Sequence, residues 1–328
     1  MNANPTPHKA AYPEPLDAIV LAGTDSNPRR MIQGQNKAFL EIGGRALVRG
    51  VVEALLQAES VGDVYVVGPR DRLDEALGDF SERVTRVPQR GKMIANAWAA
   101  IHASEEREKE RTGGNDPHRP LLVISADIPL ATAEAIDDFV ARCAAEDAEF
   151  EGGYAMLCGV ADESSLKAYY PGNHKPGIER PCVNFRESRQ RLANIYIGRP
   201  RLLTNQALLQ VGFDHRKMVK LKNVLAIAWT FLRQAGSWQA AWLSLRMQIT
   251  LMVSRRGGWL YRKLREGNSA RRTEQVCSKV LGGPIRIVVT PYGGLSLDAD
   301  NDYDYLVLNE RYEDWIDMPP ADGVPELT

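Results

Sequence analysis

The first 150 residues alternate short apolar runs with longer amphipathic stretches. The runs LDAIVLAG, DVYVVGP and PLLVISADIPL predict buried strands, and RVTRVP predicts a short one. Between them, apolar positions recur every three or four residues in ALVRGVVEALLQA, RLDEALGDF, GKMIANAWAAIHASEER and ATAEAIDDFVARCAAED, which predicts helices. Such alternation predicts an α/β domain whose parallel sheet is covered on both faces. Ligands of these sheets bind beyond the carboxyl ends of the strands.

The pattern is less regular after residue 150. EGGYAMLCGV and ANIYIGRP predict strands, residues 203–278 read as helical with a break at Gly257 and Gly258, PIRIVVTPYGGLSLD returns to strand, and DYDYLVLNERYEDW predicts a closing helix. We therefore divide the chain into four parts. They are a disordered leader (1–15), a core (16–203 and 283–312), a helical basic insertion or subdomain (204–282) and a tail (313–328).

Composition is that of an ordinary soluble globular protein, with 44% hydrophobic and 25% charged residues among 328. The net charge of −1 hides an asymmetry. Residues 201–275 hold 14 Lys and Arg against 3 Asp and Glu, a balance of +11, so the remainder carries −12. The four cysteines form no CxxC pair, which argues against a zinc site or a disulfide framework. Without a signal-peptide pattern or an apolar run of about 20 residues, we expect a cytoplasmic protein.

The loop after the first strand, LAGTDSNPRRMIQGQNK, is longer than the two to six residues of an ordinary connection. Ala22 and Gly23 allow a close backbone approach to a ligand, and Arg29, Arg30 and Lys37 are suited to phosphate oxygens. The loop is neither a P-loop nor a GxGxxG turn. It predicts an anion-binding segment, and a merely solvated basic loop is the alternative.

Two acidic motifs follow apolar strands. Asp127 in SADIP stands where a strand meets the ligand crevice, and a carboxylate there could hold Mg²⁺ or simply accept hydrogen bonds from turn amides. In SLDADNDYDYL, Asp298 or Asp300 could complete a metal site with Asp127, whereas the later aspartates are favoured at a helix N-terminus.

Together these motifs resemble the MobA-like NTP transferases, the superfamily that includes molybdenum cofactor guanylyltransferase and sugar-phosphate nucleotidylyltransferases. Leu21-Ala22-Gly23, Arg30-Met31 and Lys37 match its opening motif, Ser125 to Pro129 match its SADxP, and DADNDYDY matches its closing DVDTPEDL. The resemblance implies a three-layer Rossmann-like, GT-A-like fold with a mostly parallel mixed sheet and an inserted basic helical subdomain. Thr24 departs from the family's second glycine, and Leu192-Ala193 depart from its GGN pair.

The resemblance also implies roles for residues, and the polar stretch before the last strands adds three candidates. Catalytic roles fall to Arg30, Lys37 and Asp127; nucleotide contacts to Leu21, Ala22, Gly23, Asn96, Ser125 and Ala126; metal ligation to Asp127 with Asp300 or Asp298. The candidates for the acceptor are His174, Lys175, Arg180 and Asn194; for the first three, a solvated loop is the favoured interpretation of the residues alone.

The implied reaction is attack by an acceptor's phosphate oxygen on the α-phosphate of an NTP, CTP or GTP in the first place, with Mg²⁺ (or Mn²⁺) bound and pyrophosphate released. The acceptor would be a phosphorylated small molecule such as a sugar, alcohol or cofactor phosphate. A GT-A-type glycosyltransferase using a nucleotide-sugar and a non-catalytic nucleotide-binding module are the alternatives.

The basic helical segment holds four of the six tryptophans, Trp229, Trp238, Trp242 and Trp259. We favour a small helical core with a solvated basic face. Contact with an anionic membrane or a lipid-linked acceptor through residues 204–275 is the second interpretation, and oligomerisation is the third. No nucleic-acid-binding motif is present, so nucleic acid is not an expected partner. The oligomeric state is left open.

Overall fold

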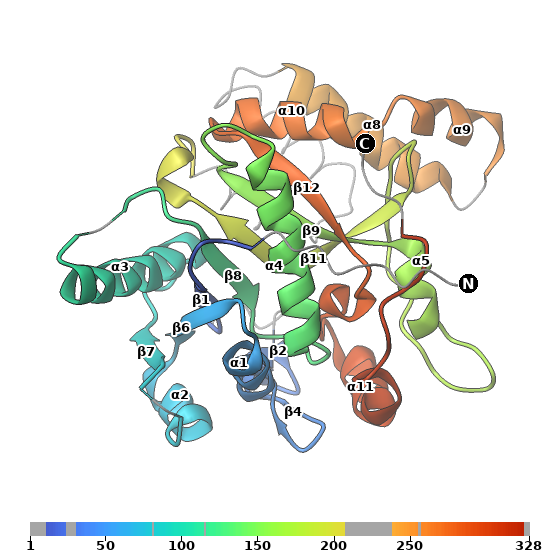
Figure 1. The fold of residues 1–328 in the computed structure, drawn as a ribbon. Coiled ribbons are helices and arrows are strands. Elements are labelled where there is room, and N and C mark those ends of the chain that lie inside the picture. The colour runs from blue at the N-terminus through green and yellow to red at the C-terminus, as the bar shows by residue number, and fades with distance from the viewer. Residues whose placement is uncertain are drawn as a thin grey trace, which may run out of the picture.

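A sheet of eight strands runs through the centre of the computed structural model, which describes residues 11–23, 31–80, 82–114, 116–206, 238–254 and 257–324 (Figure 1). The strand order is β12-β9-β11-β8-β1-β6-β7, and the short β10 pairs with β11. β11 is antiparallel to its neighbours, and the other pairs are parallel. The predicted mostly parallel mixed sheet is confirmed. The strands are β1 (Leu16–Leu21), β6 (Val61–Gly68), β7 (Val84–Pro88), β8 (Leu121–Ser125), β9 (Met156–Asp162), β10 (Val183–Asn184), β11 (Arg189–Gly198) and β12 (Ile285–Thr290).

Helices cover both faces of the sheet, giving three layers. Side chains of a strand alternate between faces, and on β1 Ala18 and Val20 pack in the core beneath α1 and α4, whereas Ile19 packs with Ala100 and Ile101 of α3. Every residue of β1 is therefore at least partly buried, as expected for a central parallel strand. The helices that precede β10 are α1 (Leu47–Gln57), α2 (Arg70–Leu77), α3 (Met93–Thr112), α4 (Ala133–Ala148) and the single turn α5 (Glu163–Leu166).

A second, smaller core joins the two ends of the chain. Ile32, Leu40 and Ile42, in and around two short hairpins, pack against Leu308 and Trp315 of α11 (Asp302–Trp315). The hairpins pair β2 (Met31–Ile32) with β3 (Gln35–Asn36) and β4 (Glu41–Ile42) with β5 (Arg45–Ala46), and a 3₁₀ turn spans Lys37–Phe39 between them. This packing brings the turn at Lys37 to the residues that precede α11.

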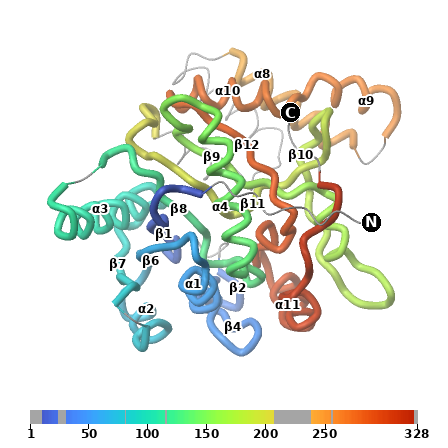
Figure 2. Tube along the Cα trace, in the orientation of Figure 1, coloured from blue at the N-terminus to red at the C-terminus, as the bar shows by residue number. Residues whose placement is uncertain are grey.

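Three helices lie in the described part of the basic segment, residues 238–254 and 257–281, at the end of the molecule away from α2 and β4 (Figures 1 and 2). They are α8 (Trp238–Ser254), α9 (Gly258–Glu266) and α10 (Ala270–Leu281). The predicted break is present, since Gly257 and Gly258 have φ of 62° and 90° between α8 and α9. α10 covers β12, where Ile287 and Val289 pack with Ala270. None of the helices in the described ranges has the length and apolar character needed to cross a bilayer.

The predicted division into four parts stays a prediction. Residues 1–10 of the expected leader and 207–237 of the expected insertion lie outside the described residues. Within the rest of the leader, the Tyr12 hydroxyl donates a hydrogen bond to the Asp147 carboxylate of α4 at 2.6 Å.

Candidate active site

Two connections leave the sheet side by side at the carboxyl ends of β1 and β8. Leu21 lies beside Ser125 in the parallel register, and the Ala126 amide donates to the Leu21 carbonyl at 3.3 Å. On the opposite side, the Ala22 amide donates to the Val67 carbonyl of β6 at 2.9 Å. The candidate nucleotide-binding residues of both motifs therefore lie at one edge of the sheet, where ligands of such folds bind.

The turn at Gly23 is closely approached by side chains from two other segments. An added Cβ at Gly23 would lie closer than 3.0 Å to the Asn96 side-chain nitrogen, so the buried Asn96 at the start of α3 lies directly beside the turn. The Arg90 amide donates to Asn96 Oδ1, which fixes the amide orientation. From the other side, Asn36 Nδ2 donates to the Ala22 carbonyl at 3.0 Å. Asn36, which sequence reasoning did not single out, thus holds the Ala22–Gly23 backbone.

Asp127 lies next to the stretch 298–300, although the two are far apart in the sequence. The Ala299 amide donates to the Asp127 carbonyl at 3.1 Å, and the Ser125 hydroxyl donates to the Asp127 carboxylate. Burial raises the pKa of Asp298, and the nearby carboxylates of Asp127 and Asp300 raise that pKa further. The structure therefore brings together the three aspartates proposed as metal ligands.

Lys37 closes this cluster from the N-terminal side. Its ammonium donates to Asp300 Oδ1 at 2.9 Å and also to the Ala299 carbonyl. Only 8% of Lys37 is exposed, because the 3₁₀ turn that carries it is covered on both sides. Arg30, the other predicted cation of the opening motif, lies outside the described residues, as do Thr24 and Arg29.

Two arginines hold the acidic stretch in place. Arg191 of β11 donates to Asp298 Oδ1 and to the Ser296 carbonyl, both at 3.0 Å. Arg180 is ion-paired with Asp304 and donates to the Asp298 carbonyl at 2.9 Å. Sequence reasoning missed Arg191, since an arginine in a strand ordinarily indicates a solvated position and its partners are more than 100 residues away. Both arginines lower the pKa of Asp298, opposing the effect of burial.

Asn194 lies on the acceptor side proposed from the family pattern. It precedes Ile195 of β11, whose partner across the antiparallel pair is Ile124, so Asn194 is opposite Ser125 at the end of β8. Asn194 is buried, and no hydrogen bond links its side chain to the described residues. At the GGN position, Leu192 is exposed while Ala193 is buried. Asn194 therefore lies beside the carboxyl end of β8, next to the turn that carries Asp127.

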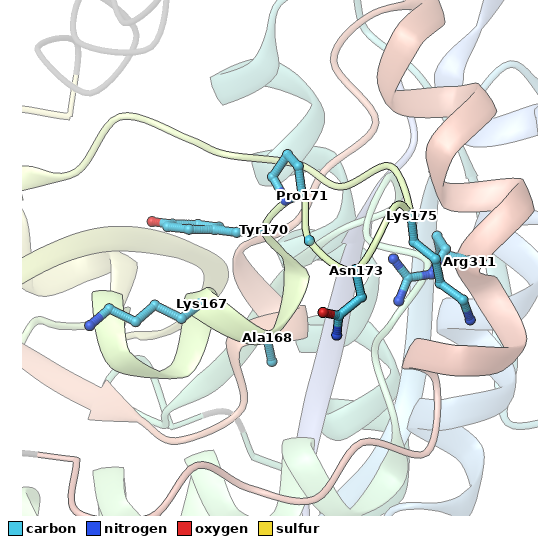
Figure 3. A pocket seen from close by; sticks show the side chains of 8 residues that line it. Lys167, Ala168, Tyr170, Pro171, Asn173, Lys175 and Arg311 are labelled. Carbon is cyan, nitrogen blue, oxygen red and sulfur yellow. The ribbon is translucent and has the colours of Figure 1, made fainter.

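Lys175 lines a separate pocket, whereas His174, its neighbour in sequence, is not among the residues that line it (Figure 3). This pocket is formed by the loop before β10 and by α11, and Lys175 and Arg311 extend along one wall while Lys167 and Tyr170 point the other way. Lys175 is ion-paired with Asp314 at 2.7 Å, and His174 has φ of 60° in the adjoining tight turn. Neither residue is hydrogen-bonded or ion-paired to the Asp127 cluster. The structure thus groups Arg180 and Asn194, but not His174 and Lys175, with the aspartates.

The carboxylate oxygens of Asp127, Asp298 and Asp300 suit a hard divalent cation if a bound ligand supplies further oxygens. Within the described ranges, no three His, Cys, Asp or Glu side chains form a complete metal cluster. The carboxylates of Asp127 and the 298–300 stretch nevertheless repel each other in a buried setting, as the raised pKa of Asp298 reflects. A cation between them would relieve that repulsion, and Mg²⁺ commonly takes one or two carboxylates together with substrate phosphates. The residues therefore fit Mg²⁺ as a shared site of protein and substrate.

Comparison with known proteins gives one domain match and several fold matches. Residues 18–178 match the family model of the MobA-like NTP transferase domain. A hypothetical transferase from Thermus thermophilus is 22% identical, with a TM-score of 0.58 over 88% of this chain and 99% of that one. A 4-diphosphocytidyl-2C-methyl-D-erythritol synthase from Anaerococcus prevotii is 9% identical, with a TM-score of 0.44 over 92% and 96%. A nucleotidyl transferase from Methanothermobacter thermautotrophicus is 13% identical, with a TM-score of 0.43 over 91% and 98%.

No curated protein matches the chain in sequence. The Thermus structure shows that the fold of this chain is shared by another protein over nearly its whole length. The family match covers both segments that meet at the site described above, the turn after β1 and the turn after β8.

Proposed function

We propose that this protein, whose residues 18–178 match the MobA-like NTP transferase domain, transfers a nucleoside monophosphate from an NTP to a phosphorylated small molecule. An oxygen of the acceptor phosphate attacks the α-phosphorus of the NTP. The bond from the α-phosphorus to the bridging oxygen of the β-phosphate breaks, and pyrophosphate leaves with that oxygen. The product is a nucleoside diphosphate ester of the acceptor's sugar, alcohol or cofactor, with one phosphate from the NTP and one from the acceptor.

One observation carries this proposal: Asp127 lies between the Ala22–Gly23 turn and the 298–300 stretch. The Ala299 amide is bonded to the Asp127 carbonyl, and Ala126 is bonded to Leu21 at the end of β1. Phosphates bound at the turn would therefore lie beside the carboxylates. This is the arrangement that phosphoryl-group transfer needs, because its catalysis rests on positioning and on stabilising charge.

The protein's own groups have distinct roles in this scheme. The Ala22–Gly23 backbone, held by Asn36 and Asn96, accommodates the nucleotide. Lys37 offsets negative charge at the acidic cluster, and Arg30 is proposed to meet the leaving pyrophosphate. Arg180 and Arg191 are positioning residues, since they hold the loop that carries Asp298 and Asp300.

Asp127 and Asp300 would hold Mg²⁺, because the Asp298 side chain is only 6% exposed whereas that of Asp300 is 21% exposed. Asp298 is paired with Arg191, and Asp300 is paired with Lys37. When bound, Mg²⁺ supplies charge neutralisation at the phosphates and orients them for in-line transfer.

The acceptor side is proposed to begin at Asn194, which lies opposite Ser125 in the antiparallel register. His174 and Lys175 could reach only an acceptor that extends into the neighbouring pocket. CTP and GTP are the first nucleotides to test.

Pyrophosphate release from each of the four NTPs, measured with Mg²⁺ and a panel of phosphorylated sugars and alcohols, tests the proposal. We expect release that requires both Mg²⁺ and an acceptor. Transfer of sugar from a nucleotide-sugar, without pyrophosphate, would favour a glycosyltransferase instead. Binding of an NTP with no turnover on any acceptor would favour a non-catalytic nucleotide-binding module.

Gly23→Ala tests the proposed nucleotide turn. Gly23 has no left-handed φ, so alanine strains no backbone there, but its methyl group would collide with the Asn96 side chain. We expect NTP to bind about 10- to 100-fold more weakly, in line with the 1–3 kcal/mol cost of overpacking. Calorimetric titration of NTP measures the effect.

Gly114→Ala is the matched control, because Gly114 also has no left-handed φ and a methyl group there meets nothing within 4 Å. It should bind NTP as the wild type does. A Gly23→Ala variant with wild-type affinity would show that the nucleotide does not approach this turn.

A further inference from the structure

α8 is apolar on two opposite faces, and only one of them is covered. Its inner face packs Ala240 and Leu243 against Val276 and Val280 of α10, with Met247 alongside. On the outer face, apolar residues recur at spacings of four and three residues, so they form one stripe along the helix. That stripe consists of Trp238, Trp242, Leu245, Ile249 and Met252, all partly or largely exposed.

The exposure of this stripe is large. Trp238 is 68% exposed, Trp242 47% and Met252 60%. The favoured interpretation from sequence, a helical core that buries the tryptophans, is therefore wrong for Trp238 and Trp242, and Trp229 lies outside the described residues. Exposed apolar stretches of this kind are typical of surfaces that bind a partner.

α9 adds a second aromatic group beside exposed cations. Trp259 is 68% exposed, and Arg262 and Lys263 on the same helix are exposed as well. The helix is nevertheless firmly attached to the core. The Tyr261 hydroxyl donates to Asn184 Oδ1 at 2.9 Å, and Arg265 Nε donates to the Phe185 carbonyl at 2.7 Å. Trp259 is thus presented to the outside by an anchored helix that also packs on α8.

The charge of this surface selects the kind of partner. Residues 238–266 contain six Lys and Arg and a single acidic residue, Glu266. Among the described cations of this segment, Arg262 and Lys263 are exposed, whereas Arg246 and Arg265 donate to backbone carbonyls. An interface with a second copy related by a twofold axis would bring this positive surface against itself, which is unfavourable. The phosphates of a nucleic acid would pair with the cations, but they would offer no apolar surface to Leu245, Ile249 and Met252.

We propose that α8 and α9 form a docking surface for an anionic lipid bilayer. Tryptophan is favoured at the interface between headgroups and acyl chains, and aliphatic side chains insert just below it. Arg262 and Lys263 contact anionic headgroups. The protein binds peripherally, with α8 lying along the surface. This proposal does not depend on the nucleotidyltransferase activity.

Flotation of the full chain with phosphatidylcholine vesicles, with and without phosphatidylglycerol, tests the proposal. We expect binding only to vesicles that contain phosphatidylglycerol, weakened by high salt because the headgroup attraction is screened. The double variant Trp242→Ala/Trp259→Ala should lower the partition coefficient at least tenfold. Arg262→Gln/Lys263→Gln should do the same, since each cation near an anionic surface is worth about fivefold in partitioning.

Matched controls remove similar side chains elsewhere. Phe150→Ala takes away an exposed aromatic ring after α4, and Lys109→Gln/Arg111→Gln removes two exposed cations at the end of α3. Both controls should bind vesicles as the wild type does. Absence of binding to anionic vesicles at low salt overturns the proposal. So does binding that both α8–α9 variants retain, binding to single-stranded DNA that competes fully with vesicles, or a dimer in solution that the tryptophan variant abolishes.

Discussion

Asp127→Asn is expected to reduce acceptor-dependent pyrophosphate release by about 10³, the scale of losing one preorganised charge-stabilising group. Asparagine keeps the volume of the side chain, but it cannot supply the anionic oxygen that the proposed Mg²⁺ site needs. The link between the two acidic segments would survive, because it is a backbone bond from the Ala299 amide to the residue 127 carbonyl. Steady-state release at saturating NTP and Mg²⁺ measures the effect.

The folded state of Asp127→Asn should be at least as stable as the wild type, because the substitution removes a carboxylate that repels Asp298. Thermal unfolding would check this. Asp302→Asn serves as the matched control from the same acidic run, since Asp302 is exposed in the first turn of α11. It should release pyrophosphate at nearly the wild-type rate. A folded Asp127→Asn variant that keeps more than a tenth of the activity would remove Asp127 from the proposed chemistry.

The sheet was predictable because its strands are buried on both faces. Runs such as LDAIVL have no polar alternation, which is typical of central parallel strands, and the helices between them carry clear apolar stripes. The antiparallel insertion of β11 between β8 and β9 could not be derived in the same way. Its position depends on pairing with β8, about 70 residues away, and with β9, about 30–40 residues away, and that pairing leaves no local pattern.

The candidate site, like the sheet, was predictable only in the parts that follow from the parallel strands. Leu21 to Gly23 and Ser125 to Asp127 could be placed together, since the carboxyl ends of parallel strands share one edge. The partners of the cations could not be placed. Lys37 meets Asp300 across 263 residues, and Arg191 meets Asp298 across 107. Arg180, expected on the acceptor's phosphate, is ion-paired with Asp304 instead.

The exposed tryptophans show a different limit of sequence reasoning. A helix that is apolar around its circumference ordinarily predicts burial on all sides. α8 is apolar on two opposite faces, yet among the described elements α10 and β10 cover its inner face while Trp238, Trp242 and Met252 on the outer face stay exposed. Periodicity reports how many faces of a helix are apolar, but it does not report how many are covered.

Lys37→Met is expected to impair both stability and turnover. The methionine fills the same space, but it leaves the Ala299 carbonyl and Asp300 without the ammonium that now binds both. Breaking a largely buried ion pair costs about 3–5 kcal/mol, and the partial exposure of Asp300 reduces this to about 2 kcal/mol. For a chain of this size we expect the melting temperature to fall by about 3 °C. Pyrophosphate release should fall by about 10² to 10³.

The double variant Lys37→Met/Asp300→Asn separates these two effects. Removing both charges relieves the carboxylate that has lost its Lys37 partner, so much of the lost stability should return. Turnover should not return, because the double variant still lacks the cation and also lacks a proposed metal ligand. Thermal unfolding and pyrophosphate release on the same preparations distinguish the outcomes. A double variant that recovers turnover together with stability would mean that Lys37 and Asp300 serve only the fold, and that the divalent cation is held by Asp127 without either of them.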